Sequence, residues 1–261
     1  MLFCEDSELL ERECLGPCLY RFSVRSNNIC DNAKPGQFLQ IQVDGGLGAF
    51  LRRPFSIFDI DRSNGIVDFI FQAKGQGTRL LSKKHVGEHI NIIGPLGDGV
   101  FSWDGCGNVM IIGGGIGIFP LYLLAKRLPK KHNAFVRLGF RSKDNVVLED
   151  EFREQCHALN IFTDDGTYGL RGSVCRNLDS DLGSDDIDAI FACGPLPMLR
   201  SVKEIAARRE IPCQVSLEER MGCAIGACMG CAVKFSDTGK PPAYARVCKD
   251  GPVFNAADVE F

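Results

Sequence analysis

The chain has 261 residues, of which 45% are hydrophobic and 24% charged, and its formal net charge is −3 at pH 7. This composition is typical of a globular protein with a real core, and it gives no electrostatic reason to expect nucleic-acid binding. The longest uncharged apolar run, residues 109–125, contains four glycines and a proline and is shorter than the ~20 residues of a membrane span. We expect a soluble protein without a membrane partner, built from two domains and a small appendage.

Short runs rich in Ile, Phe and Val, separated by turn residues, occupy the chain up to about residue 100. They predict strands at residues 37–43, 53–61, 65–73 and 89–93, with one short helix at 77–84. Short strands that follow one another in this way predict a small antiparallel β-barrel.

Two segments of this predicted barrel carry groups that bind anions. Arg53-Pro54-Phe55-Ser56 combines a guanidinium, which can clamp a diphosphate, with a hydroxyl that can hydrogen-bond a cofactor ring. Lys74-Gly75-Gln76-Gly77-Thr78 opens the short helix, and a helix start also favours anions. Either segment alone could be an ordinary surface turn. Their occurrence in one barrel predicts a phosphate-bearing ligand.

A third segment of the barrel, His85-Val-Gly-Glu88-His89, matches the zinc-binding pattern H-x-x-E-H. Those ligands need a continuous helix to share one face, whereas Gly87 interrupts a helix and a strand is predicted directly afterwards. We therefore expect a turn with two solvated histidines at this position.

From about residue 107 the pattern changes to a regular alternation of strands and helices. Strands are predicted at residues 109–113, 134–140, 161–163, 189–193 and 214–217, and helices at 119–127, 148–156 and 198–209. Such alternation predicts an α/β domain with a doubly wound parallel sheet.

Two segments follow strands of this sheet, where open parallel sheets bind their ligands. Gly113-Gly114-Gly115-Ile116-Gly117 connects a strand to a helix, and bare glycine backbone lets a pyrophosphate approach closely. Its spacing is not G-x-G-x-x-G, so a Rossmann dehydrogenase is not indicated, and a simple tight turn remains an alternative. Cys193-Gly194-Pro195 ends a later strand, where it can contact the nicotinamide half of the same ligand.

Four of the thirteen cysteines have a ligand spacing. Cys223, Cys228 and Cys231 follow the pattern C-x4-C-x2-C, with Cys248 further on, which is the plant-type spacing for a [2Fe–2S] cluster. A structural zinc site is the alternative, but zinc more often uses two short pairs of cysteines. Glycines at 222, 226 and 230 favour a loop that bends tightly around a cluster.

The remaining nine cysteines have no ligand spacing, and we expect most of them to be buried, reduced thiols in a cytoplasmic protein. They are Cys4, Cys14, Cys18, Cys30, Cys106, Cys156, Cys175, Cys193 and Cys213.

Together these motifs resemble the ferredoxin–NADP reductase superfamily. The segments 216–223 and 246–254 resemble one group within it, the electron-transfer subunits of NAD-linked dihydroorotate dehydrogenase B. The resemblance covers essentially the whole chain. Ala224 is a departure, because the family commonly has glycine after the first cluster cysteine.

The resemblance implies a β-barrel that binds FAD (residues 1–102), an α/β domain that binds NAD (103–215) and a small C-terminal [2Fe–2S] module (216–261) that continues from the α/β domain. Arg53, Ser56 and the turn at residues 75–78 would hold FAD, with Phe55 shaping the flavin pocket. The glycines at 113–115 and 117, residues 193–195 and Asp165 would contact NAD(H). The implied partner is an FMN-containing dihydroorotate dehydrogenase catalytic subunit, in a heterotetramer with two copies of each chain.

The implied function is electron transfer in pyrimidine biosynthesis, from the partner's flavin through the cluster and FAD to NAD+. No acid or base residue is needed for hydride transfer, so no catalytic side chain is predicted. One alternative is the flavin and iron–sulfur subunit of an NAD(P)H:ferredoxin oxidoreductase or a sulfhydrogenase. Another is a nucleotide-binding sensor with structural zinc. Arg141-Ser142-Lys143 leaves NADP open as the nucleotide.

Overall fold

A computed structural model describes residues 1–43, 49–105, 107–129, 131–235 and 244–261. The chain forms two compact units. The first contains residues 1–100, 218–232 and 246–252, and the second contains residues 101–217, 233–245 and 253–261. In the part of the chain that the structure describes, no helix is both long enough and apolar enough to cross a membrane.

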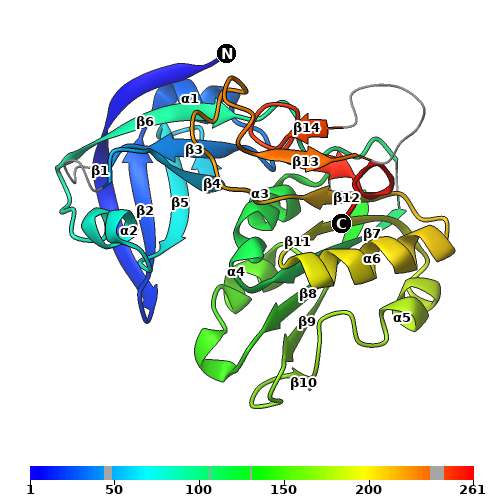
Figure 1. Ribbon diagram of the computed structural model, residues 1–261. Coiled ribbons are helices and arrows are strands. Elements are labelled where there is room, and N and C mark those ends of the chain that lie inside the picture. The colour runs from blue at the N-terminus through cyan, green and yellow to red at the C-terminus, as the bar shows by residue number, and fades with distance from the viewer. Residues whose placement is uncertain (44–48, 106, 130, 236–243) are drawn as a thin grey trace. The chain divides into compact units, whose positions relative to one another are not determined.

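The first unit is built on a closed six-stranded antiparallel barrel, as the sequence predicts (Figure 1). Its strands neighbour one another in the order β1 (Phe3–Gly16), β2 (Leu19–Arg25), β5 (Ile66–Gln72), β4 (Arg53–Asp61), β3 (Phe38–Ile41) and β6 (His89–Leu96). Two short helices, α1 (Asn27–Asn32) and α2 (Gln76–Leu81), connect strands. Ser26 caps α1 by accepting a hydrogen bond from the Ile29 N–H.

Aromatic rings from three strands form the core of the barrel. Phe22 on β2 packs edge-on against Phe71 on β5 with ring centroids 5.0 Å apart. Phe55 on β4 stacks on Phe69 at 5.7 Å and contacts Phe71 at 5.4 Å. Burial of these large side chains is the main stabilisation available to a barrel of this size.

Strands β1 and β2 were not predicted, although β1 is the longest strand described. Residues 11–14 of β1 are all exposed, and the strand carries glutamates and arginine where a half-buried strand would alternate apolar and polar residues. It forms a hairpin with β2 and also pairs with β6, and the pairing with the distant β6 leaves no local sequence pattern.

The second unit is an α/β domain with a seven-stranded sheet, as predicted. The strand order is β10 (Leu170–Arg171), β9 (Ala158–Thr163), β8 (His132–Phe140), β7 (Gly107–Gly114), β11 (Ile187–Cys193), β12 (Cys213–Ser216) and β15 (Val253–Asn255). All pairs are parallel except β12 with β15. The sheet is therefore parallel with one antiparallel edge strand.

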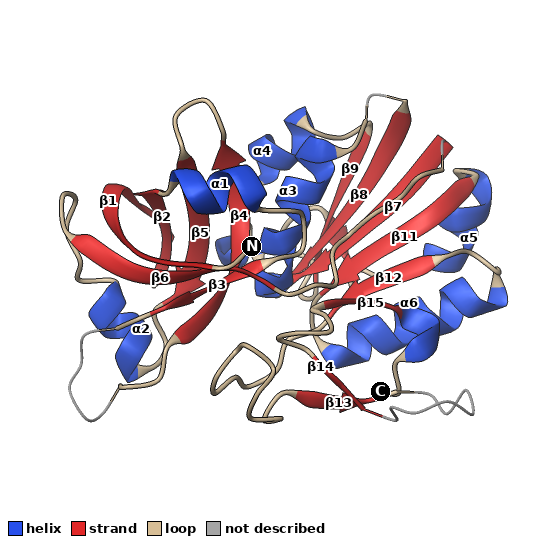
Figure 2. Cartoon of the chain, turned by 90° about the horizontal axis from the view of Figure 1, so that it is seen from above, coloured by secondary structure: helices blue, strands red, loops and turns tan. Residues whose placement is uncertain are grey.

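Helices cover both faces of this sheet, which is the doubly wound arrangement (Figure 2). One face carries α3 (Phe119–Arg127) and α4 (Glu149–Glu154), and the other carries α5 (Leu178–Ser184) and α6 (Leu196–Arg208). The described residues of this unit also form the 3-10 turns η2 (Gly115–Ile118), η3 (Lys143–Asn145) and η4 (Ala256–Asp258). Helix α5 and strands β10 and β15 were not predicted.

A buried arginine holds the segment before α5 on the sheet. Arg137 on β8 is 1% exposed and forms an ion pair with Asp181 of α5. Its guanidinium also donates to the backbone carbonyls of Val174 and Arg176, and it lies 4.5 Å from the centroid of the Phe162 ring. These bonds compensate a cationic side chain that is otherwise expensive to bury.

The C-terminal segment divides between the two compact units. Residues 218–232 and 246–252 belong to the barrel unit, where Lys249 pairs with Asp98 at 2.8 Å. Strand β15 instead extends the α/β sheet. A small ladder of β13 (Ala232–Lys234) and β14 (Tyr244–Arg246) connects these segments. The sequence could not show which C-terminal segments belong to which unit, because this depends on contacts between distant residues.

Candidate cofactor sites

The four predicted cluster cysteines lie together in the barrel unit. Their sulfurs form two hydrogen-bonded pairs, Cys223 with Cys228 and Cys231 with Cys248. Two thiolates for each of two irons is the ligand set of a [2Fe–2S] cluster. Within the described residues, no three His, Cys, Asp or Glu side chains form a group that could hold a single metal ion. This pairing matches the two thiolates per iron of such a cluster.

Backbone amides of the loop point at the sulfurs. The Cys223 sulfur accepts from the N–H groups of Ala227 and Cys228, each at 3.3 Å. The Cys231 sulfur accepts from the Cys248 N–H at 3.4 Å. Burial raises the pKa of the Cys223 thiol, but the N–H groups of the loop and the Cys228 thiol outweigh it and lower that pKa to about 6. The loop thus favours the thiolate that iron needs.

The Cys248 thiol behaves in the opposite way. Burial, followed by the neighbouring Cys231 sulfur, raises the pKa of the Cys248 thiol to about 12. A thiolate at this position therefore needs a positive charge to balance it. The irons of a cluster supply that charge, so the donor set fits the group.

The loop bends around the sulfurs through residues in the left-handed region. Ala224, Gly226 and Met229 have φ angles of 58°, 84° and 59°. The value at Ala224 gives a physical reason for glycine at this position in the family, since glycine adopts positive φ without steric cost. Ala224 is also buried, at 1% exposure, so its methyl group packs against neighbours that partly offset the backbone cost.

Arg246 holds the cluster loop against the segment that carries Cys248. Its guanidinium donates to Asp250 through Nε and Nη2, at 2.9 and 2.8 Å, and to the Gly226 carbonyl at 2.9 Å. A Cβ on Gly226 would lie only 2.9 Å from Lys249 Cβ. Glycine is therefore required here both for its φ angle and for the close approach of Lys249.

The two predicted FAD segments meet in the barrel. A Cβ placed on Gly77 would lie 3.0–3.2 Å from the Arg53 guanidinium, so this charged group rests directly on the start of α2. Arg53 donates to the carbonyl of Leu51, whereas Arg52 is engaged with the backbone of Gln40 and Asn91. A guanidinium beside the free N–H groups of a helix start fits a diphosphate.

The other FAD residues predicted on β4 lie on both faces of that strand. Phe55 is half-buried, and its ring stacks in the aromatic core, while Pro54 and Ser56 point to the opposite face of β4 because side chains alternate along a strand. The Thr78 hydroxyl closes the turn by bonding the Gly75 N–H at 3.1 Å. Lys74 is exposed.

The two predicted NAD segments also meet, at the carboxyl ends of β7 and β11. Gly113 and Cys193 are register partners in the sheet. A Cβ on Gly117 would lie 2.6 Å from the Cys193 carbonyl, so the glycine loop packs backbone to backbone against the Cys193-Gly194-Pro195 turn. Gly114 similarly faces Pro195. This edge of the sheet is where an open α/β fold binds a nucleotide.

This close packing leads to a prediction for Gly117→Ala. The added methyl group must push the Cys193-Gly194-Pro195 turn away, so we expect a loss of stability of about 1–3 kcal/mol and weaker NADH binding. Thermal unfolding and an NADH titration measure the two effects. Gly16→Ala is the matched control, since a Cβ there has no neighbour within 4 Å. Wild-type NADH affinity in Gly117→Ala would contradict this placement of the nucleotide.

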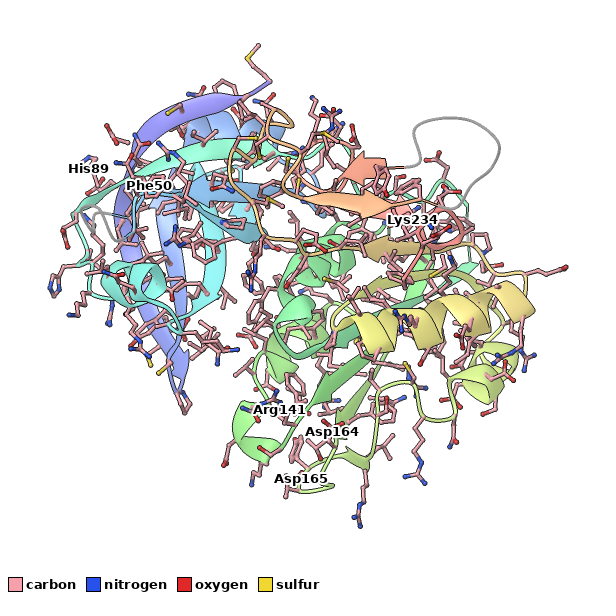
Figure 3. All side chains as sticks on the ribbon, viewed as in Figure 1. Phe50, His89, Arg141, Asp164, Asp165 and Lys234 are labelled. Carbon is pink, nitrogen blue, oxygen red and sulfur yellow. The ribbon has the colours of Figure 1, made fainter. Side chains whose placement is uncertain are left out.

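Asp165 lies in a loop that is tied to the loop after β8. Its carboxylate accepts from the Thr167 N–H at 3.0 Å and the Thr167 hydroxyl at 2.7 Å, and these bonds lower the pKa of Asp165. The Lys143 N–H donates to the same hydroxyl at 2.8 Å. Figure 3 shows Arg141, Asp164 and Asp165 grouped where β8 and β9 end.

Sequence reasoning missed several exposed apolar side chains beside these sites. Ile225 and Met229 of the cluster loop are 53% and 52% exposed. Ile116 in the glycine loop and Leu196 at the start of α6 are also exposed. Large apolar side chains at loop positions that also carry glycines or cysteines were the available signal.

The remaining cysteines only partly follow the prediction. Cys30 and Cys193 are buried, but Cys4, Cys14 and Cys18 are exposed and three others are half-buried, so the expectation of general burial is wrong. Cys106 lies outside the described residues. Strands that are exposed on one or both faces carry several of them. The predicted turn lies at residues 86–87, His89 begins β6, and both histidines are exposed, as predicted.

Known proteins share this fold and these segments. Residues 218–260 match the model of the iron–sulfur cluster binding domain of dihydroorotate dehydrogenase B. The chain is similar to a solved structure of an NADH-dependent reduced ferredoxin-NADP oxidoreductase, with a TM-score of 0.85, 30% identity and coverage of 97% of this chain and 89% of that one. A ferredoxin reductase of carbazole 1,9a-dioxygenase has the same fold, with a TM-score of 0.66 at 19% identity over 81% and 67% of the two chains.

The fold is thus that of the flavin-dependent ferredoxin reductases, with an added iron–sulfur segment. The chain is 40% identical to the dihydroorotate dehydrogenase B (NAD(+)) electron transfer subunit of Geobacillus thermodenitrificans and 38% identical to that of Bacillus caldolyticus. Each alignment covers 92% of both chains. The chain belongs to this family of electron transfer subunits.

Proposed function

We propose that this chain carries electrons between a dihydroorotate-oxidising catalytic subunit and NAD+, through a [2Fe–2S] cluster and FAD. The observation that carries the proposal is the presence of three sites on one chain. These are two paired sets of cysteine sulfurs, an arginine on a helix start in a barrel, and two backbone loops in contact at the carboxyl edge of a parallel sheet. The family relationship supports the same assignment.

Each site has a proposed set of residues. The cluster ligands are Cys223, Cys228, Cys231 and Cys248; the FAD residues are Arg53, Pro54, Phe55, Ser56, Lys74, Gly75, Gly77 and Thr78; the NAD residues are Gly113, Gly114, Gly115, Gly117, Asp165, Cys193, Gly194 and Pro195. We assign the functional segments as residues 1–102 for FAD, 103–215 for NAD and 216–261 for the cluster.

The chemistry divides between the cofactors and the chain. A bound flavin exchanges a hydride with NAD and single electrons with an iron–sulfur cluster. The chain's own residues bind and orient: Arg53 neutralises a diphosphate, the backbone at Gly117 and Gly194 admits the nucleotide closely, and the N–H groups around Cys223 favour its thiolate. No acid or base side chain is required for the hydride transfer itself.

The proposed partner is a catalytic subunit that holds FMN and oxidises dihydroorotate, in an assembly of two copies of each chain in the cytoplasm. The relatives are named as electron transfer subunits, which supports a separate catalytic chain. The nucleotide is NAD rather than NADP: the exposed Arg141 and Lys143 share their edge of the sheet with two carboxylates, Asp164 and Asp165, which repel a 2′-phosphate.

The exposed apolar side chains of the cluster loop lead to a prediction about binding of the partner. Ile225 and Met229 are exposed on either side of the exposed ligand Cys228 in the sequence, so they can exclude water where electrons leave the cluster. We expect Ile225→Glu combined with Met229→Glu to weaken binding of the partner by at least about tenfold, because buried interfacial charges are costly. Surface plasmon resonance with the purified partner measures the change.

A matched control is Val86→Glu, which places the same charge on another exposed apolar residue of the barrel unit. It should bind the partner with wild-type affinity. The double variant should also keep the wild-type cluster spectrum. Wild-type affinity in the double variant would place the interface elsewhere.

The test of the proposed function is an assay of the chain with whatever copurifies with it. The complex should reduce NAD+ when dihydroorotate is added, and the chain alone should not. A complex without dihydroorotate-dependent activity contradicts the proposal. Zinc in place of iron, with no visible flavin band, identifies a nucleotide-binding protein instead.

A second function is favoured by the structural similarity over 97% of this chain to the NADH-dependent reduced ferredoxin-NADP oxidoreductase. In that case the chain would exchange electrons with another large flavoprotein. Copurification of such a protein, together with NADH-dependent reduction of ferredoxin and no response to dihydroorotate, distinguishes the two.

A further inference from the structure

Gln40 on β3 has a polar atom that no described residue satisfies. Its side chain is 1% exposed. The amide nitrogen donates a weak hydrogen bond to the sulfur of Met221 at 3.9 Å, while the amide oxygen Oε1 is buried and has no hydrogen-bond partner among the described residues. A buried carbonyl without a partner costs about 1–3 kcal/mol, so such an atom calls for an explanation.

The orientation of this amide is fixed by chemistry. The thioether sulfur of Met221 can only accept a hydrogen bond, so the NH2 group of Gln40 must face it. The oxygen is then left as a pure acceptor. The group that satisfies it has to present an N–H or O–H.

Gln40 lies between Pro54 and Ser56, which are predicted to contact FAD, and the start of the cluster loop. Gln40 lies directly opposite Pro54 in the β3–β4 ladder, so its side chain shares the face of Pro54 and Ser56. Leu39 points to the other face, beside Phe55. Met221, which Gln40 contacts, is two residues before the cluster ligand Cys223.

We propose that Gln40 is a flavin-contacting residue whose Oε1 accepts a hydrogen bond from the N3–H of the isoalloxazine ring of FAD, while its amide nitrogen holds the start of the cluster loop. This inference rests on the proposed function, since it requires FAD on the barrel. The N3–H is the one N–H donor of the oxidised ring, so an acceptor-only atom on this face matches it. One side chain then positions the flavin relative to the cluster loop.

The test measures FAD affinity in purified, cluster-containing protein after removal and readdition of flavin. Gln40→Met keeps the volume and the contact with Met221 but removes the acceptor. We expect its dissociation constant for FAD to rise about tenfold, with the cluster content and its electron paramagnetic resonance signal unchanged. Gln155→Met, in the α/β unit, is the matched control and should bind FAD as the wild type does.

FAD methylated at N3 gives an independent measurement on the wild-type chain. We expect the wild type to bind it about tenfold more weakly than FAD, and Gln40→Met to bind the two flavins equally. Equal binding of both flavins by the wild type overturns the inference, as does a Gln40→Met variant that keeps full FAD affinity or loses its cluster instead. If the wild-type chain binds no FAD at all, the proposed function is wrong. This outcome differs from those that overturn only the assignment of Gln40.

Discussion

Substituting Cys228 by alanine should abolish the cluster and the coupled reaction while leaving the flavin half of the protein active. Cys228 is exposed, so its loss leaves no cavity in the core, but it removes one of two thiolates from its iron. Changes to the surroundings of a metal ligand already cost 10–100-fold, so we expect dihydroorotate-dependent NAD+ reduction to fall by more than about a hundredfold. The iron–sulfur signal in electron paramagnetic resonance should disappear.

NADH oxidation by a dye that takes electrons directly from flavin should continue at the wild-type rate in this variant, because the path from NADH to FAD does not include the cluster. Cys156→Ala is the matched control: it removes a half-buried thiol of the α/β unit that has no ligand spacing and should change neither activity. Retention of the coupled reaction by Cys228→Ala would mean that electrons bypass the cluster.

Replacing Arg137 by leucine should cause the largest loss of stability. The substitution leaves the carbonyls of Val174, which is buried, and of Arg176 without this donor and removes the ion-pair partner of Asp181. An unsatisfied buried hydrogen-bonding group costs about 1–3 kcal/mol, and the lost ion pair to the partly exposed Asp181 adds to this, so we expect a loss of about 3 kcal/mol in all. For a protein of this size that corresponds to a fall in Tm on the order of 10 °C.

Thermal unfolding followed by far-ultraviolet circular dichroism measures this effect. Arg208→Leu, at an exposed position near the end of α6, is the control and should change the Tm little. Arg137→Lys should lie between the wild type and the leucine variant, because it keeps the charge but cannot form all of the bonds. A Tm of Arg137→Leu within the range of the control would show that the buried arginine is dispensable.

The sequence predicts the α/β unit better than the barrel because parallel strands are buried on both sides. Residues 109–113 and 189–193 are continuous apolar runs, and both are strands in the structure. Strand β1 is missed because it is exposed and charged, and β15 because only three residues pair with the sheet. Helix α5 begins after Asn177 with a left-handed cap, and its apolar face consists of only two residues, Leu178 and Leu182, which is too short a pattern to predict a helix.

Some features of the candidate sites are short sequence motifs, and others are contacts between segments far apart in the chain. The cysteine spacing and the glycine loop are local patterns, and their residues could be listed from the sequence. The contact of Arg53 with Gly77 and that of Gly117 with Cys193 join segments far apart in the chain, so only the fold shows that each pair forms one site. Gln40 carries no motif at all. Gln40 is a candidate because its side chain is buried and contacts Met221, and neither fact can be read from the sequence.

The relay itself can be tested most directly on the purified chain carrying FAD and its cluster. NADH is added without oxygen and without any partner, and the cluster is followed by electron paramagnetic resonance. The account predicts that NADH bleaches the flavin and that the signal of a reduced [2Fe–2S] cluster then appears, with NADPH far less effective. A flavin that is reduced by NADH while the cluster stays oxidised in a chain of intact iron content would contradict the proposed order of electron transfer.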